Sequence, residues 1–480
     1  MKIVIIGAGF TGGLLARALV AERNTVILID KNPERVRSAG DQLDCTVIEA
    51  DGTDLEILEK AGIASADALV TLTGDDEINM ITCSLVDAVY PEVVKIARVR
   101  NYDYYKRTVE VVKREKNRSI REGRPTFGID YIINPDVAAA SSISRAMEIG
   151  AAGSAIEIEG GYEIIALPVI ENSPLAGKKL RNLATLPEWN YLVAFVETDG
   201  ETELPSGETI LKIGDHIGIL VHNTDVDKLL RFAGVVSTPI NRIAIFGADN
   251  VSALTVAAQT ETVKSIWHAF LKLKKPQSRE ILVIDRDGER CRKLAEKFPD
   301  VRILNGDITD DGLLQNEGIC SCDLMVAASG NYERNLLTAA YLKLRGVTKA
   351  IALTSDSAFS GIADKLGVDV TIPMRDVMID TIMSHLRGRN IKAVHSVGAR
   401  KFEIVSCEIS PDSEASGKKL RELEGLNGSL VLLIRKPGSQ DYLIPKGGTE
   451  MESGTLVVLI MPSGDSDILE MLAGRPEMIA

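Results

Sequence analysis

Apolar and polar residues follow one another along the start of the chain in blocks that predict alternating strands and helices. The stretches Lys2–Ile6 and Thr25–Asp30 are short and largely apolar, as expected of strands that are buried on both faces. Between them, Thr11–Ala21 has the length and composition of a helix and begins at a glycine-rich loop. Buried strands joined by helices favour a parallel sheet with right-handed crossovers, which is a doubly wound Rossmann-type fold.

The same pattern occurs twice along the chain. Gly7 recurs as Gly247, the segment SPLAGKKLRNL at 173–183 recurs as SEASGKKLREL at 413–423, and LPSGETILKIGD at 204–215 recurs as IPKGGTEMESGT at 444–455, each 240 residues later. Agreement of three landmarks at one offset indicates a tandem duplication of a two-part unit. The second part of each unit has short apolar runs broken by Gly, Pro and Asp-Gly turns, which predicts a small, mainly β domain (α+β).

This pattern divides the chain into four parts. We expect a Rossmann lobe at 1–135, a connector helix with a small β lobe at 136–235, a second Rossmann lobe at 241–373, and a second connector helix with its β lobe at 374–480. Both connector helices carry apolar residues on more than one face. Our hypothesis from this pattern is that they pack against another chain.

The first glycine loop has the features of a nucleotide site. Gly7-x-Gly9-x-x-Gly12 follows a strand and opens a helix, so that Gly7 allows a tight turn, Gly9 lets the backbone approach a pyrophosphate, and Gly12 brings the helix close to the sheet. Asp30 ends the second strand, 18 residues after Gly12. A carboxylate there can accept the hydroxyls of an adenosine ribose and would repel a 2′-phosphate, which favours NAD(H) or an adenine nucleotide over NADP.

Three further strand ends supply candidates in the same lobe. The ends of the third and fourth strands would meet the adenine and the pyrophosphate, and a basic residue on the fifth strand could reach a distal phosphate. The alternative is that the residues at these strand ends only form turns and that the arginines of the fifth strand face solvent. The candidates are Asp51, Gly52, Thr73, Gly74, Arg98 and Arg100.

The second glycine loop is degraded. Asp249 and Ser252 replace two of the glycines, and Asp249 adds a negative charge where a pyrophosphate would lie. The acid after the second strand survives, so a nucleoside without the usual phosphate placement is not excluded. We expect this lobe to be mainly structural. The retained equivalents of the first site are Gly247, Asp285 and Asp307.

Composition narrows the possible partners and chemistry. The net charge of -13 argues against a nucleic-acid partner, since binding to phosphates rests on a basic surface. No stretch has the roughly 18 consecutive apolar residues of a membrane span, so we expect no direct membrane insertion. The six cysteines form no CxxC pair and the five histidines are scattered, which favours core thiols in a reducing cytoplasm over a metal site.

Signs of catalysis are weak. Tyr102 and Lys106 match the YxxxK of short-chain dehydrogenases, but they directly follow the predicted fifth strand and lack the context of those enzymes. We therefore expect that the protein is not an enzyme. An NAD-dependent oxidoreductase or epimerase of Rossmann type is the alternative function, and a scaffold or chaperone that binds no nucleotide is a third class.

Taken together, the motifs resemble a known family. The duplicated units GAGFTG, LIDKN, EADGTD, TGDDEINM and IARVR, each followed by a module like SPLAGKKL, look like the TrkA-type regulatory subunit of Trk potassium uptake systems, which has tandem RCK (KTN) domains. The resemblance covers essentially the whole chain. It implies that the nucleotide contacts are Gly7, Gly9, Phe10, Thr11, Gly12, Asp30, Lys31, Asp51, Gly52, Thr73, Gly74 and Arg98 or Arg100.

The resemblance also implies a role and partners. Such a protein is a cytosolic gating ring that controls a membrane potassium transporter or channel in response to NAD(H) or ATP/ADP. Its partner would be a potassium-translocating membrane subunit of the TrkH, TrkG or KtrB kind, which holds it at the inner face of the membrane. It would be a homo-oligomer, a dimer or a tetramer, because four two-domain chains supply a ring of eight RCK modules.

Overall fold

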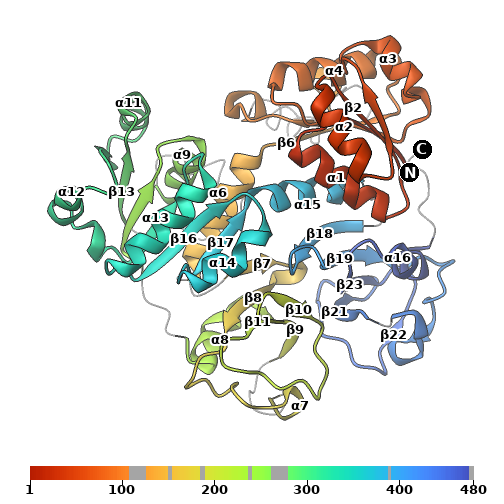
Figure 1. The fold of residues 1–480 in the computed structure, drawn as a ribbon. Coiled ribbons are helices and arrows are strands. Elements are labelled where there is room, and N and C mark those ends of the chain that lie inside the picture. The colour runs from red at the N-terminus through yellow and green to blue at the C-terminus, as the bar shows by residue number, and fades with distance from the viewer. Residues whose placement is uncertain are drawn as a thin grey trace.

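The computed structural model describes residues 1–106, 126–149, 154–183, 190–235, 240–260, 279–386, 391–426 and 428–474. Within them, the chain consists of two similar halves, each with a six-stranded sheet followed by an antiparallel sheet. Figure 1 shows the two Rossmann lobes side by side, with both smaller β lobes beneath them. The duplicated architecture and the fold class predicted from the sequence are confirmed.

The first Rossmann lobe has strand order β3-β2-β1-β4-β5-β6, with every pairing parallel. This order places the glycine loop at the point where the chain leaves the middle of the sheet, which is where such folds bind ligands. Its strands are β1 (Lys2–Ile6), β2 (Thr25–Asp30), β3 (Thr46–Glu49), β4 (Ala68–Thr71), β5 (Val94–Arg98) and β6 (Tyr131–Ile133). Its helices are α1 (Phe10–Ala21), α2 (Pro33–Gln42), α3 (Leu55–Lys60) and α4 (Asp76–Val89).

The second Rossmann lobe repeats this topology as β14-β13-β12-β15-β16-β17, again fully parallel. Its strands are β12 (Arg242–Phe246), β13 (Glu280–Asp285), β14 (Arg302–Asn305), β15 (Leu324–Ala327), β16 (Lys349–Thr354) and β17 (Val370–Pro373). Its helices are α9 (Asn250–Gln259), α11 (Gly288–Lys297), α12 (Asp311–Asn316), α13 (Tyr332–Leu344) and α14 (Ser360–Lys365).

The helices of both lobes are short and many begin at a side chain that caps them. Asn32 accepts backbone N–H groups at the start of α2, and Asp75 does so for α4. Such caps satisfy N–H groups that have no partner inside the helix, and they fix where each helix begins. No helix in the described part of the chain is long and apolar enough to cross a membrane.

The two β lobes pack against each other. Phe195 and Leu220 of the first lobe share one apolar cluster with Ile404 and Leu432 of the second. Their elements are β7 (Ser154–Glu157), β8 (Tyr162–Pro168), α7 (Leu180–Leu183), β9 (Tyr191–Thr198), β10 (Glu201–Glu203), β11 (His216–His222) and α8 (Val226–Ala233), then β18 (Ile391–Val397), β19 (Phe402–Glu408), β20 (Lys418–Lys419), β21 (Leu430–Arg435), β22 (Glu450–Met451), β23 (Leu456–Pro462) and α16 (Ser466–Ala473).

Each connector helix packs against the Rossmann lobe of the other half of the chain. They are α6 (Pro135–Glu148) and α15 (Met374–Leu386). Ile143 of α6 lies in one apolar core with Ile245 of β12, and Ile379 of α15 lies in one with Leu15 of α1. In Figure 1, α6 lies beside α9 and α15 lies beside α1. Each connector therefore completes the core of the other half. The hypothesis that these apolar faces pack against another chain is wrong, because the surface that covers them belongs to the same chain.

Candidate nucleotide-binding site

The glycine loop of the first lobe contains glycines of two kinds. Gly7 has φ +109°, and a Cβ there would lie 3.1 Å from the backbone of Leu72, while a Cβ on Gly12 would overlap the carbonyl oxygen of Gly7. Gly9 is different, because its φ is -66° and the nearest atom to an added Cβ is Arg35 Nη1 at 4.0 Å. The fold thus requires Gly7 and Gly12, whereas Gly9 leaves open space at the N-terminus of α1 that a phosphate can fill.

Asp30 holds the loop in place. Its buried carboxylate accepts the N–H of Ala8 on Oδ2 at 2.7 Å and the N–H of Asn32 on Oδ1 at 2.8 Å, and Arg35 lies 3.6 Å from Oδ2. Each carboxylate oxygen can accept a further bond, so the expected contact with a ribose is compatible with this geometry. Asp285 binds the second loop in the same way, through Ala248 at 2.7 Å and Asp287 at 2.8 Å. Survival of this acid in the degraded copy therefore has a structural reason.

The end of β4 is joined to the end of β5 by a buried amide. The N–H and hydroxyl of Thr73 donate to Asn79 Oδ1 at 2.9 and 2.7 Å, and Asn79 Nδ2 donates to the carbonyl of Arg98 at 2.9 Å. Arg98 Nη1 also donates to the carbonyl of Thr73 at 3.4 Å. The predicted contacts Thr73 and Arg98 are thus brought together beside the exposed Gly74.

Arg98 is a candidate for binding an anion. Within the described residues no carboxylate pairs with it, and its Nε is buried without a hydrogen-bond partner. Burial and the neighbouring guanidinium of Arg100 lower the pKa of Arg98. A partly buried positive charge without a counterion is stabilised when a phosphate supplies one.

The end of β3 contributes a glycine with a structural role and an exposed acid. A Cβ on Gly52 would overlap the side chain of Ile6, so this glycine lets the turn lie against β1. Asp51 accepts the N–H and hydroxyl of Thr53 at 3.0 and 2.8 Å. These bonds, with a contribution from the charge of Lys31, lower the pKa of Asp51. The ionised carboxylate therefore lies at the rim of the site, with Lys31 close to it.

Two of the predicted contacts, Arg100 and Phe10, also contact other parts of the chain. Arg100 pairs with Asp136 of α6 at 3.2 Å and lines a cavity of the second lobe. Phe10 is 59% exposed, and the guanidinium of Arg375 lies 3.6 Å from the centre of its ring. Arg375 lies in the first turn of α15 and pairs with Asp356 at 3.1 Å, so the second half of the chain places a cation against the first loop.

Sequence reasoning missed two of these residues for different reasons. Asn79 has a counterpart in Asn335, which binds Ser329 and the carbonyl of Leu353 in the same way. A comparison of the two copies within TGDDEINM and SGNYERNL could have found it. No such signal exists for Arg375, because its proximity to the loop depends on the exchange of α15.

The second loop keeps the glycine of the tight turn but not a glycine at the position of Gly12. Gly247 has φ +103°, and a Cβ there would lie 2.8 Å from Ser329 Cα. Asp249 occupies the position of Gly9, where a side chain is sterically tolerated. Ser252, at the position of Gly12, is fully buried, and its hydroxyl has no hydrogen-bond partner within the described part of the chain.

The YxxxK match lies away from the first loop. Tyr102 and Lys106 both lie on a helical segment that follows β5. The Tyr102 ring faces the second lobe, with Lys297 Nζ 5.9 Å from its centre. This position gives no support to a catalytic role beside the first site.

The fold and the loop define a protein with two Rossmann lobes and two β lobes, in which the first Rossmann lobe carries the features of a nucleotide site. Family models agree, since the TrkA-N domain matches residues 3–135 and 268–373 and the TrkA-C domain matches residues 164–234 and 404–474. The chain belongs to the TrkA family.

Relatives match along the whole length. The Trk system potassium uptake protein TrkA homolog 1 of Methanosarcina mazei is 28% identical over 479 residues, which cover 98% of this chain and 99% of the relative. The Trk system potassium uptake protein TrkA of Halomonas elongata is 26% identical, with 96% of each chain covered.

Solved structures share the fold. The GsuK channel bound to NAD has a TM-score of 0.58 at 17% identity, with 98% of this chain and 78% of that chain covered. The GsuK RCK domain has a TM-score of 0.55 at the same identity, with 98% and 94% covered.

Proposed function

We propose that the protein is the nucleotide-binding regulatory subunit of a Trk potassium uptake system. Its first Rossmann lobe binds NAD(H) or an adenine nucleotide such as ATP or ADP. Binding changes the arrangement of the lobes and thereby the activity of a potassium-translocating membrane subunit. Membership of the TrkA family and the names of its relatives support the potassium system as the setting.

The observation that carries the nucleotide assignment is the geometry around Gly9. This glycine has no reason in the fold, it opens the N-terminus of α1, and Arg98 lies near the adjacent strand end without a counterion in the described structure. The space, the free N–H groups and the positive charge suit a pyrophosphate.

The connector helices offer a route from the site to the rest of the molecule. Phe10 of the loop contacts Arg375 at the start of α15, and α15 then runs through the core of the first lobe before the chain enters the second β lobe. A ligand that draws Arg375 or Arg98 toward its phosphates favours one arrangement of α15 over another. Such differential binding is what regulation by a ligand requires.

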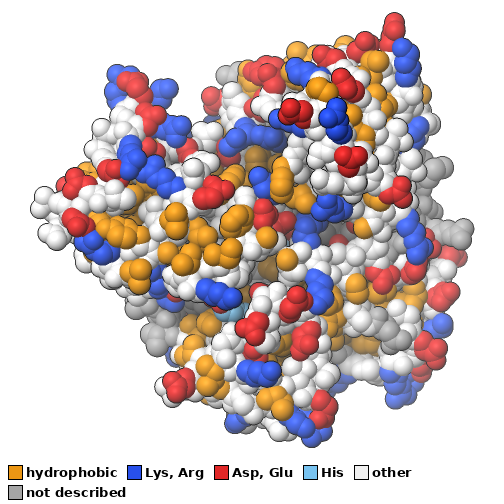
Figure 2. All heavy atoms as spheres, viewed as in Figure 1, with side chains coloured by type: hydrophobic (Ala, Val, Ile, Leu, Met, Phe, Trp, Pro, Cys, Tyr) orange, Lys and Arg blue, Asp and Glu red, His pale blue; other side chains and the backbone are white. Residues whose placement is uncertain are grey.

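Assembly into an oligomer is supported by exposed apolar side chains on equivalent helices. Ile81, Leu85 and Val89 form a stripe along α4, and Leu337 and Leu344 lie on the outside of α13. Figure 2 shows apolar side chains gathered over the part of the second lobe where α13 and α14 lie. We propose that these surfaces join copies of the chain, up to a ring of eight modules from four chains.

Nucleotide binding can be tested by thermal shift of the full-length protein with NADH, NAD, ATP and ADP. We expect at least one of them to raise the melting temperature of the wild type. Gly9→Asp, which copies the residue of the second loop, should abolish the shift, and Asp30→Ala should weaken it. A shift that both variants retain would place the nucleotide elsewhere.

Regulation requires the membrane subunit. Potassium flux into vesicles that contain it should depend on the added regulatory subunit and on the nucleotide that gives the thermal shift. With Gly9→Asp the subunit should still bind the vesicles, but flux should no longer respond to the nucleotide. An unchanged response would contradict the proposed site, whereas absence of any effect of the wild-type subunit would contradict the proposed function.

A further inference from the structure

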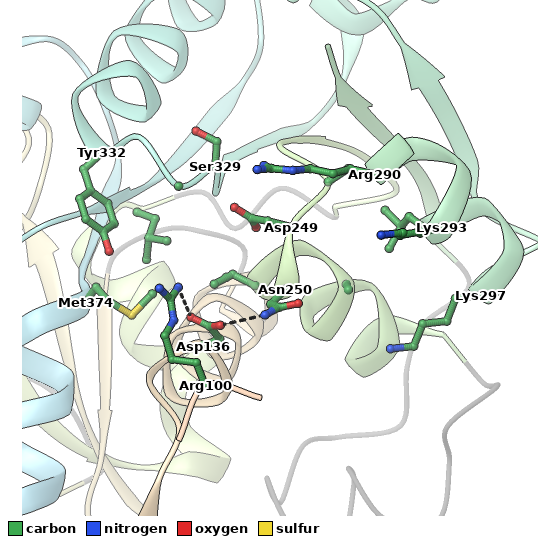
Figure 3. A pocket seen from close by; sticks show the side chains of 16 residues that line it. Arg100, Asp136, Asp249, Asn250, Arg290, Lys293, Lys297, Ser329, Tyr332 and Met374 are labelled. Atoms are coloured by element: carbon green, nitrogen blue, oxygen red, sulfur yellow. Dashed lines mark hydrogen bonds and ion pairs between the residues drawn. The ribbon is translucent and has the colours of Figure 1, made fainter. Parts of the chain in front are cut away.

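A cavity of about 400 Å³ lies over the degraded loop of the second lobe. Figure 3 shows it between the loop at Asp249 and Asn250, helix α11, and residues that arrive from the first half of the chain. Arg100 and Asp136 belong to that first half and are joined to the loop by a hydrogen bond from Asn250 to Asp136 at 3.3 Å. The size suits a small organic molecule better than a single inorganic ion.

One wall of the cavity is basic. Arg290, Lys293 and Lys297 lie on one face of α11, because they are spaced three and four residues apart, and they project toward the loop in Figure 3. The equivalent helix of the first lobe differs at two of these positions. Counted from the acids Asp30 and Asp285, the matching residues of α2 are Arg35, Ser38 and Gln42. The two extra lysines are thus particular to the second lobe and are not a feature of the fold.

Among the described residues, no carboxylate pairs with these two lysines. Arg290 lies 3.3 Å from Asp287, and Arg100 pairs with Asp136 at 3.2 Å. Within the described residues no carboxylate lies within 4.0 Å of Lys293 or Lys297, although Lys297 also lies over the ring of Tyr102. Two positive charges that face a cavity match the charge of a phosphate monoester, which is close to -2 at neutral pH.

Asp249 contributes a different feature, which is a buried hydrogen-bond acceptor. It lines the cavity, and its Oδ1 is buried without a hydrogen-bond donor among the described residues. A buried acceptor of this kind is satisfied by a hydroxyl or amino group of a ligand. Its position at the start of α9 also excludes a pyrophosphate from the place it would take in an intact loop. Tyr332 and Met374 form a less polar wall at the other end, and Leu353 also lines the cavity.

We propose that this cavity binds a hydroxyl-bearing phosphate monoester of about the size of a nucleoside monophosphate. Lys293 and Lys297 bind the phosphate, Asp249 accepts a hydroxyl, and Tyr332 with Met374 contacts the remaining part of the ligand. The second Rossmann lobe is then a ligand site in its own right, changed from the dinucleotide type, and residues of both halves of the chain line it.

The test is isothermal titration of the full-length Gly9→Asp protein with AMP, ribose 5-phosphate and inorganic phosphate. The Gly9→Asp background removes the site of the first lobe, so failure of the proposed function and failure of this inference give different results. We expect AMP to bind with one site per chain, and ribose 5-phosphate to bind more tightly than inorganic phosphate. Affinity should fall as salt rises, because the phosphate contacts are ionic.

Variants taken from the first lobe separate the roles of the side chains. In the same background, Lys293→Ser and Lys297→Gln install the residues of α2 at helix positions that tolerate them. Each should weaken AMP binding by roughly tenfold or more, as expected for loss of a charged hydrogen bond. The matched control is Arg292→Gln, because Arg292 lies on the same helix but does not line the cavity and pairs with Glu289. This control should leave affinity unchanged.

Three results would overturn the inference. AMP that binds the wild type but not the Gly9→Asp protein belongs to the first lobe. Binding that falls equally with Arg292→Gln and with the lysine variants reflects only the general charge of α11. Finally, if Asp249→Ala leaves the preference for ribose 5-phosphate over inorganic phosphate unchanged, Asp249 does not bind a hydroxyl of the ligand.

Discussion

At the scale of single residues, the two glycine loops separate what the fold needs from what a ligand needs. The turn requires a glycine at Gly7 and Gly247, where φ is strongly positive, and both copies keep it. At the position of Gly9 a Cβ would have space, and the second copy has Asp249 there. The second loop has therefore kept the glycine of the tight turn, lost the glycine that would face a ligand, and also replaced the buried glycine at the position of Gly12 by Ser252.

This distinction predicts different outcomes for two glycines of the first loop. Gly12→Ala should lower the free energy of unfolding by about 2 kcal/mol or more, because its Cβ would overlap the backbone of Gly7. Gly9→Asp should change stability by no more than about 0.5 kcal/mol while it abolishes the thermal shift by nucleotide. Chemical denaturation, monitored by circular dichroism, measures the first effect. Equal loss of stability in both variants would show that Gly9 is also required by the fold.

Asp249 should make stability depend on pH. Burial, with the nearby carboxylate of Asp136, raises the pKa of Asp249 to about 6, whereas in the unfolded chain it is about 4. Between these values the folded protein binds the extra proton, so this contribution to stability is complete below about pH 4 and is lost as pH rises through about 6. A shift of about two units corresponds to at most roughly 3 kcal/mol.

Asp249→Asn should therefore be more stable than the wild type at pH 7.5, and the difference should disappear near pH 4. Denaturation of both proteins across this range measures it. The Asp249 side chain makes no cap hydrogen bond at the start of α9, so loss of a cap does not complicate the comparison. A stability difference that is the same at every pH would show that the ionised carboxylate is not penalised in the folded protein.

At the scale of the elements, the sequence predicts strands and caps well but not their partners. The bounds of β1 and β2 follow directly from short apolar runs, and Asn32 and Asp75 mark helix starts where side chains cap them. The apolar pattern of α6 and α15 shows that two faces are covered, but not which surface covers them. For the same reason the contact of Arg375 with Phe10 could not be predicted. The division of the chain at 1–135, 136–235, 241–373 and 374–480 stays a prediction.

The exchange of connector helices predicts that core substitutions act on the opposite half. Ile143→Ala in α6 should loosen the second Rossmann lobe, and Ile379→Ala in α15 should loosen the first, each by about 2–5 kcal/mol. Amide hydrogen exchange measures the loss of stability in each lobe. Amides of β12 should lose protection in the Ile143→Ala variant, and amides of β1 should lose it in the Ile379→Ala variant. The two variants serve as controls for each other. Loss of protection mainly in the Rossmann lobe that precedes each helix would contradict the exchange.

At the scale of the whole molecule, the two halves form one body, because each connector helix lies in the other half and the β lobes share an apolar cluster. A rearrangement at the first loop can therefore reach both Rossmann lobes without a flexible hinge between them. The Rossmann lobes then present equivalent helices, α4 and α13, at their outer surfaces. A chain built this way can join to further copies through both of its halves, as closure of a ring requires.

Assembly through α13 predicts that a charge on its outer face will separate the copies. Leu337 is 65% exposed and would be buried between copies, at a gain of roughly 1.5–3 kcal/mol for a side chain of its size. Leu337→Glu should therefore shift sedimentation of the protein toward smaller species at micromolar concentration. Ile213→Glu is the matched control, since Ile213 is 62% exposed on a β lobe and should leave the oligomer intact. Sedimentation unchanged by Leu337→Glu, or changed equally by both variants, would remove α13 from the interface.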